Sequence, residues 1–138
     1  MTLLVDTNVV SELRKRVSLR NPGVKSWEQE TDLDSVYLSA ITVSELATWV
    51  ARVKHRDAVQ GGILGDWFNT RVMGQFATRI VPVDAEVGIC AGQLHVPDPR
   101  DYRDAFIAAT AIVRGMTVVT RNTAHFAPMG ARVINPFS

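Results

Sequence analysis

The chain has 138 residues, a length typical of one domain of about 100–200 residues, so we expect a single domain over residues 1–138. Hydrophobic residues make up 46% and charged residues 21%, which excludes a disordered chain and allows a sizeable core without disulfide or zinc cross-links. The formal net charge of +1 neither requires nor excludes a polyanionic partner, so composition alone assigns no function.

Short apolar runs alternate along the chain with longer helical patterns. Helices begin at capping signals such as Asn21-Pro22 and Asp101, and one of them ends at Gly115. In chain order, we predict a strand at Leu3–Val5, helices at Val9–Arg16 and Pro22–Glu30, a strand at Val36–Ser39, a helix at Thr42–Lys54, a further helix at Trp67–Ala77 after an uncertain glycine-containing stretch, a strand at Arg79–Val83, helices at Ala85–His95 and Tyr102–Arg114, and strands at Thr117–Thr120 and Arg132–Ile134.

This alternation predicts an α/β fold of three layers, in which helices cover both faces of a mostly parallel sheet of four to five strands. The connections between parallel strands are then right-handed crossovers. In such sheets, ligands gather beyond the carboxyl ends of the strands. Polar residues directly after each strand are therefore the first candidates for function.

The chain carries no signal for secretion or membrane insertion. The single cysteine, Cys90, excludes an internal disulfide and lies in an apolar stretch, where we expect it to pack as a small hydrophobic residue. The N-terminus lacks the basic region of a signal peptide, and no apolar run approaches the roughly 18–20 residues that span a bilayer. We therefore expect a cytoplasmic protein with no membrane attachment.

Four polar residues lie near predicted strand ends. Asp6 follows the first strand, Glu45 lies in the first turn of the helix after the second, and Asn122 follows the fourth. Asp104 lies in the first turn of the apolar helix that leads into the fourth strand. An ordinary crossover is expected to place Asp104 on the opposite rim from Asp6, unless the loop at 95–100 carries the start of the helix across. The order of elements alone does not decide between these placements.

Each of these residues also has a purely structural interpretation. Asp6 could be the N-cap of the following helix, and Glu45 could close a capping box with Thr42. Asp104 could complement the helix dipole, and Asn122 is a common turn residue. No single residue in the set decides between a structural and a chemical role.

Five segments, taken together, resemble one family. Any one of them is weakly specific, but they occur in the family's order and span nearly the whole chain. The opening LLVDTNVVSEL (3–13) resembles PIN-domain proteins, especially the VapC toxins of bacterial toxin–antitoxin pairs. The later motifs of these toxins resemble SAITVSEL (39–46), RDAFIAATA (103–111) and TVVTRNTAHF (117–126). The tail of the FitB-like branch resembles VINPF (133–137).

The resemblance implies a PIN fold in which the acids, Asp104 included, meet in one cleft. By position, Asp6, Glu45 and Asp104 match the three core acids, which are catalytic and hold the metal. Asn122 matches the fourth catalytic position, where members carry Asp or Asn. Because asparagine supplies no negative charge, the sequence leaves open whether the site holds one metal ion or two.

Carboxylates suit the hard cations Mg²⁺ and Mn²⁺, and three packed carboxylates repel one another unless a cation neutralises them. The expected activity is that of a magnesium-dependent endoribonuclease, in which a metal-activated water attacks an RNA phosphodiester, with tRNA or another structured RNA as substrate. Neighbouring Thr7, Asn8 and Thr120 are candidates for hydrogen bonds that orient the acids.

The expected partners are RNA, a small VapB-like antitoxin and a second copy of the chain. Phosphate binding requires cations, and His125 in the fourth motif is a further possible RNA contact. The visible basic candidates, each of which could equally be a solvated helix face, are Arg14, Lys15, Arg16, Arg52 and Lys54.

Two other classes compete with the enzyme. A non-catalytic PIN module with a degenerate metal site is disfavoured by the three acids, although Asn122 is compatible with it. A phosphorylated receiver domain would need paired acids at the first strand and a lysine after a late strand. Neither the neighbours of Asp6 nor Arg121 meets that requirement.

Overall fold

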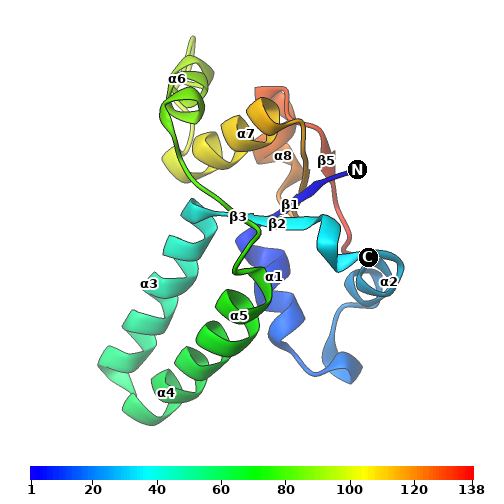
Figure 1. Cartoon of the computed structure of the whole chain (residues 1–138), viewed down its shortest axis with the longest axis vertical. Helices are drawn as coiled ribbons and strands as arrows, with labels where there is room; N and C mark the ends of the chain where they lie inside the picture. Colours follow the sequence, from blue (N-terminus) through cyan, green and yellow to red (C-terminus); the bar gives the residue numbers. More distant parts are fainter.

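A five-stranded sheet lies at the centre of the molecule, and every pairing in it is parallel (Figure 1). The computed structural model describes residues 1–138. The strand order is β3-β2-β1-β4-β5, so the first strand of the chain is the central one. The strands are β1 (Leu3–Val5), β2 (Val36–Ser39), β3 (Ile80–Val81), β4 (Thr117–Val119) and β5 (Val133–Ile134).

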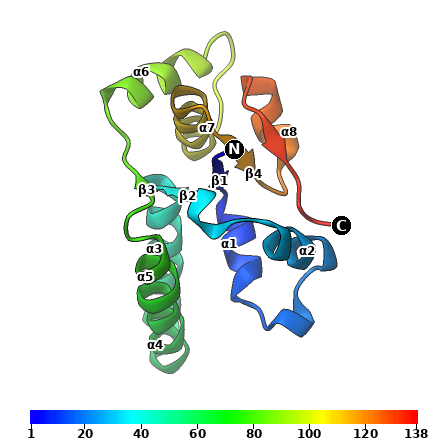
Figure 2. The same ribbon diagram turned by 45° about the vertical axis from the view of Figure 1, so that its right-hand side comes forward.

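Helices lie on both faces of the sheet, with α6, α7 and α8 on one side and α1 to α5 on the other (Figures 1 and 2). None of them is both long and apolar enough to cross a membrane. The helices are α1 (Thr7–Arg14), α2 (Pro22–Glu30), α3 (Ala40–Arg56), α4 (Ala58–Trp67), α5 (Met73–Phe76), α6 (Ala85–Leu94), α7 (Tyr102–Arg114) and α8 (Thr123–Phe126), joined by the 3₁₀ turns η1 (Val17–Leu19), η2 (Leu33–Ser35) and η4 (Ala127–Met129) and the π-helical turn η3 (Phe68–Val72).

The side-chain alternation of β1 divides the core into two layers. Leu3 and Val5 pack with Val9 of α1 and Leu46 of α3, whereas Leu4 packs with Ile107 of α7. All six side chains are buried. A strand that is apolar on both faces has to be covered on both, so the predicted three-layer α/β fold is confirmed.

The start of α3 differs from the prediction. The helix begins at Ala40, not at Thr42, because the hydroxyl of Ser39 caps it by accepting a hydrogen bond from the Ile41 amide at 3.0 Å. The predicted capping box is therefore wrong. Thr42 lies inside the helix, and its buried Oγ1 has no hydrogen-bond partner. Glu45 is consequently in the second turn and free of any capping role.

Two other elements differ from the prediction. The third strand is shorter than predicted because Pro82 has no amide hydrogen to continue the ladder. The uncertain glycine-containing stretch is helix α4, and the predicted helix at 67–77 is divided between the end of α4, η3 and α5. The caps at Asn21 and Asp101 and the left-handed Gly115 that ends α7 are as predicted.

The crossover into β4 places the start of α7 on the same rim of the sheet as the end of β1. A crossover helix runs antiparallel to the strands that it joins. Arg114 ends α7 and Thr117 begins β4, so the helix finishes at the amino edge of the sheet and starts, with Asp104, at the carboxyl edge. The expectation that an ordinary crossover puts Asp104 on the opposite rim from Asp6 is wrong for this reason.

Helices α3 and α4 form an antiparallel pair whose close approach depends on one glycine. A Cβ atom at Gly61 would lie 2.4 Å from the Cα and 2.6 Å from the amide nitrogen of Lys54. At Gly62, one position along, a Cβ would meet no atom within 4 Å. The two glycines therefore have different roles in the same helix.

We expect Gly61→Ala to lower the free energy of unfolding by about 1–3 kcal/mol, because two helix backbones would have to separate. Gly62→Ala is the matched control and should raise it by about 0.5–1 kcal/mol, because alanine restricts the unfolded chain and favours the helix. Urea denaturation of both variants measures the difference. Equal effects at the two positions would contradict the close-approach argument.

Candidate active site

Asp6 lies at the point where the sheet ends and α1 begins. Its amide donates to the Val119 carbonyl at 2.9 Å, which continues the pairing of β1 with β4 by one residue. Its Oδ1 accepts from the Thr7 amide at 2.8 Å and so caps α1, which begins at Thr7 and not at Val9 as predicted. The side chain is only 5% exposed. Asp6 is therefore both an N-cap and a buried carboxylate at the sheet edge.

Two polar side chains bind the second carboxylate oxygen of Asp6, and the backbone amide of Asn122 supports one of them. The Thr120 hydroxyl donates to Asp6 Oδ2 at 2.8 Å, and Asn8 Nδ2 donates to the same oxygen at 3.1 Å. Thr120 Oγ1 in turn accepts from Asn8 Nδ2 at 3.3 Å and from the Asn122 amide at 3.0 Å. This network joins the ends of β1 and β4 and holds the carboxylate in one orientation.

Glu45 reaches the same region from α3. Its Oε1 accepts from the Thr7 hydroxyl at 3.0 Å, and its Oε2 lies 3.5 Å from Arg103 Nη1 of α7. Burial raises the pKa of Glu45 above its ordinary value, and repulsion by Asp6 and Asp104 adds to the effect. The hydrogen bond from Thr7 and the charge of Arg103 oppose the rise without cancelling it.

Asp104 completes the group from the first turn of α7. Its Oδ2 lies 3.0 Å from His125 Nδ1, which follows β4 on α8. Burial raises the pKa of Asp104, the charge of Asp101 raises it further, and contact with His125 opposes the rise. The sequence placed His125 only loosely near the site. Its position in the fourth motif, after a strand end, is the signal that pointed to this contact.

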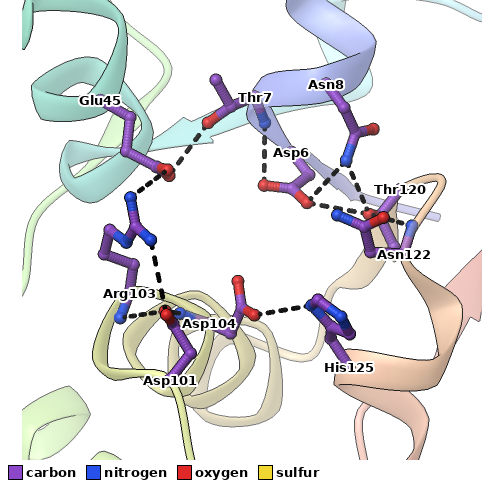
Figure 3. Close-up of polar contacts among 10 residues, drawn as sticks. All are labelled: Asp6, Thr7, Asn8, Glu45, Asp101, Arg103, Asp104, Thr120, Asn122 and His125. Atoms are coloured by element: carbon purple, nitrogen blue, oxygen red, sulfur yellow. Dashed lines mark hydrogen bonds and ion pairs between the residues drawn. The ribbon is translucent and has the colours of Figure 1, made fainter.

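These residues line one polar cavity of about 370 Å³. The carboxylates of Asp6 and Asp104 face each other across it (Figure 3). Ten residues line the cavity, none of them hydrophobic: Asp6, Thr7, Asn8, Ser11, Glu45, Asp101, Arg103, Asp104, Asn122 and His125. The structure therefore brings together all the acids and Asn122 that the sequence singled out, and adds Ser11, Asp101, Arg103 and His125.

The donor set of the cavity fits a hard divalent cation, because its ligands are carboxylate and amide oxygens. No three His, Cys, Asp or Glu side chains lie close enough together to ligate one ion directly. The assignment of Asp6 and Asp104 as contacts of one ion, directly or through water, with Glu45 completing the shell or orienting a water, stays a prediction. Mg²⁺ keeps several waters and is usually held by one or two carboxylates, which this arrangement does allow.

The basic residues suggested for RNA binding lie outside this cavity. Arg14 stacks over the rings of Trp49 and Trp67, 5.9 Å from each centroid, and borders a larger, mostly apolar cavity of about 520 Å³. Lys15 forms an ion pair with Glu12 at 3.0 Å. The remaining three, Arg16, Arg52 and Lys54, are exposed and do not line the polar cavity.

The comparisons with known proteins agree with this geometry. A profile of the PIN domain matches residues 3–130. The chain belongs to the PIN-domain family. Within the family it is of the VapC/FitB type: it is 35% identical to Toxin FitB of Neisseria gonorrhoeae over 98% of both chains, and 33% identical to VapC ribonuclease Y4jK of Sinorhizobium fredii over 98% of this chain and 97% of the relative.

Solved structures place this PIN domain close to the same branch. The crystal structure of FitAcB from Neisseria gonorrhoeae matches with a TM-score of 0.87 at 35% identity, over 98% of each chain. The structure of FitAB bound to an IR36 DNA fragment matches with a TM-score of 0.89 at 33% identity, over 99% of this chain and 96% of that chain. The PIN-like α/β fold inferred from the motifs is thus confirmed.

Two fully buried threonines allow the same substitution to be compared in opposite settings. Thr120 Oγ1 makes three hydrogen bonds, whereas Thr42 Oγ1 makes none. We expect Thr120→Val to lower the free energy of unfolding by about 1–3 kcal/mol, and Thr42→Val to leave it unchanged or raise it by up to about 1 kcal/mol. Chemical denaturation measures both. A loss of similar size at the two positions would contradict the assigned networks.

The raised pKa of Glu45 predicts a pH-dependent stability in metal-free buffer. The folded state holds the Glu45 proton more tightly than the unfolded state, so its contribution to stability falls as pH rises from the ordinary value of 4.5 through the raised one. Glu45→Gln removes this loss. The variant should unfold at a higher temperature than the parent at neutral pH and show no gain near about pH 3.

Thermal unfolding in EDTA across this pH range is the measurement. A variant that is less stable than the parent at neutral pH would show that the charged carboxylate stabilises the fold.

Proposed function

We propose that this chain is a magnesium-dependent endoribonuclease and the toxin of a toxin–antitoxin module. The observation that carries the proposal is the single polar cavity in which β1, α3 and α7 present Asp6, Glu45 and Asp104. Relatives that match over nearly their full length support it, since they are named a VapC ribonuclease and a FitB toxin. RNA is the proposed substrate, with tRNA or another structured RNA as the expected class.

The proposed cofactor is Mg²⁺, with Mn²⁺ as an alternative. Asp6 and Asp104 would hold it, directly or through water, because their carboxylates face each other across the cavity (Figure 3). When bound, such an ion polarises a phosphoryl oxygen and lowers the pKa of a coordinated water. Asn122 presents an amide to the cavity and adds no charge, so we propose one tightly held ion.

The protein side chains have distinct parts in the proposed hydrolysis. Asp6 is held rigid by Thr120 and Asn8, so its oxygens keep one orientation as the phosphate enters. Glu45 has a raised pKa, which makes it a better proton acceptor at neutral pH, and it would orient and deprotonate the attacking water. His125, on α8, lies beside Asp104 and holds its carboxylate in place.

The proposed partners follow from the solved relatives. These relatives include FitAcB from Neisseria gonorrhoeae and FitAB bound to a DNA fragment. We propose a small antitoxin of the VapB or FitA type for this chain, and a homodimer as its own assembly. The cytoplasm, where RNA and such an antitoxin are available, is the proposed location.

The test is cleavage of total RNA by the purified chain with Mg²⁺ and with EDTA. We expect cleavage only with the metal, and a loss of about a hundredfold or more in Asp6→Asn and Asp104→Asn, the scale on which removal of one catalytic group acts. Asp66→Asn, at an exposed acid of α4 outside the cavity, is the matched control and should cleave like the parent.

Metal binding gives a readout that does not depend on the RNA chosen. Mg²⁺ should raise the unfolding temperature of the parent and of Asp66→Asn, and should not raise that of Asp6→Asn. Metal-stabilised protein that binds RNA and cuts none would favour the non-catalytic PIN module. Cleavage that persists undiminished in Asp104→Asn would overturn the assignment of the site.

A further inference from the structure

Arg103 is the only lysine or arginine among the residues that line the polar cavity. It lies in the first turn of α7, next to Asp104, and its side chain is 63% exposed. Its Nη1 lies 3.5 Å from Glu45 Oε2, and its Nη2 lies 3.4 Å from Asp101 Oδ2 (Figure 3). The guanidinium thus spans the mouth of the cavity between α3 and the start of α7.

The charges of the cavity create a problem for an anionic ligand. Four carboxylates line it, those of Asp6, Glu45, Asp101 and Asp104, against the one permanent cation of Arg103. A phosphodiester entering this field is repelled by the acids, and one divalent ion neutralises only part of their charge. A fixed cation at the cavity wall is therefore the group that could attract the phosphate.

The contacts of Arg103 leave most of its hydrogen-bonding capacity unused. Its two ion pairs are long and exposed, and such pairs contribute about 0–1 kcal/mol. Arg20, by contrast, is 14% exposed and donates to Glu28 at 2.8 and 3.1 Å and to two backbone carbonyls. Arg20 is a structural residue, whereas the guanidinium of Arg103 can exchange partners at little cost.

The position of Arg103 in its helix is unfavourable for structure alone. Cations in the first turn of a helix are opposed by the helix dipole, and the N-cap of α7 is already supplied by Asp101. The flanking acids Asp101 and Glu45 hold the pKa of Arg103 above its ordinary value, so the side chain stays charged. Its planar group matches the oxygens of a phosphate, which it can bind with two parallel hydrogen bonds.

We propose that Arg103 is a substrate-binding residue, which releases Glu45 and Asp101 and binds the non-bridging oxygens of an RNA phosphate in the cavity. The inference rests on the proposed ribonuclease function and adds to it the residue that receives the substrate. It also gives the Glu45–Arg103 ion pair a role in the resting protein: the guanidinium partly balances Glu45 until the phosphate replaces it.

The test compares Arg103→Gln with Arg100→Gln. Arg100 is an exposed residue three positions earlier that does not line the cavity, so both variants lose the same charge in the same neighbourhood. Binding of a short fluorescein-labelled single-stranded RNA is followed by anisotropy in EDTA as a function of salt. With Mg²⁺, kcat and KM are measured on the same RNA.

We expect Arg103→Gln to weaken RNA binding roughly tenfold and to raise KM by a similar factor, with a smaller change in kcat. The slope of log affinity against log salt should fall by about 0.7, the value for one phosphate contact on a single strand. Arg100→Gln should change neither quantity to this extent. Equal behaviour of the two variants would overturn the proposal.

Arg103→Lys separates substrate binding from a structural role, because lysine keeps the charge for the two ion pairs and loses the planar group. Phosphate binding by Arg103 predicts that Arg103→Lys binds RNA at least about threefold more weakly than the parent at an unchanged unfolding temperature. Parent-like affinity in Arg103→Lys, together with a lowered unfolding temperature in Arg103→Gln, would show a purely structural residue.

The outcome is separable from that of the proposed function. If the parent cleaves RNA, Asp104→Asn does not, and Arg103→Gln matches Arg100→Gln, the function stands and this inference fails. If no RNA is cleaved while Arg103→Gln alone loses affinity and salt slope, the substrate-binding role stands and the catalytic proposal fails.

Discussion

The whole arrangement depends on the buried hydrogen bond between the Thr120 hydroxyl and the Asp6 carboxylate. The two residues are 114 positions apart in sequence, and the 2.8 Å contact joins the carboxyl ends of β1 and β4. The same carboxylate caps α1 through the Thr7 amide. The sheet edge, the start of α1 and one wall of the cavity are therefore positioned by one side chain. A buried carboxylate that is fully hydrogen-bonded keeps its orientation in a way that an exposed one does not.

Beyond this hydrogen bond, the acids of the cavity are partly buried and repel one another. Burial and neighbouring acids raise the pKa values of both Glu45 and Asp104. The protein offsets the repulsion with local partners: Thr7 and Arg103 for Glu45, and His125 for Asp104. All three partners contact the acids through their side chains. The repulsion is thus offset by a hydrogen bond from Thr7 and by the contacts of Arg103 and His125 with the acids.

Sequence patterns predicted the three-layer fold because strands and caps depend on short-range information, whereas the grouping of the acids in one cleft was implied only by the family resemblance. Apolar strands, the caps at Asn21 and Asp101 and the stop at Gly115 are readable from neighbouring residues. The failures occurred where a distant contact decides. Thr42 and Glu45 have the spacing of a capping box, but Ser39 caps the helix and the partner of Glu45 is Thr7, 38 positions away.

The glycine-containing stretch before Trp67 could not be assigned for the same reason. Glycine weakens a helix locally, and only the approach of α3 at Lys54 explains Gly61. The position of Arg103 is informative in the sequence alone. A cation in the first turn of a helix is electrostatically unfavourable unless an acid or a ligand compensates it. The signal for His125 is its position in the fourth motif, shortly after a strand end.

The neutral side chain at position 122 fits this balance of charge. The cavity already holds four carboxylates against one arginine, and a fifth negative charge would raise the cost of the metal-free state further. Asn122 still offers an oxygen that can bind a water or a weakly held ion, and its backbone amide supports Thr120. A neutral residue here avoids adding a further charge to a cavity in which four carboxylates face one guanidinium. The side-chain amide of Asn122 is therefore better explained by the charge balance of the cavity than by the loss of a catalytic acid.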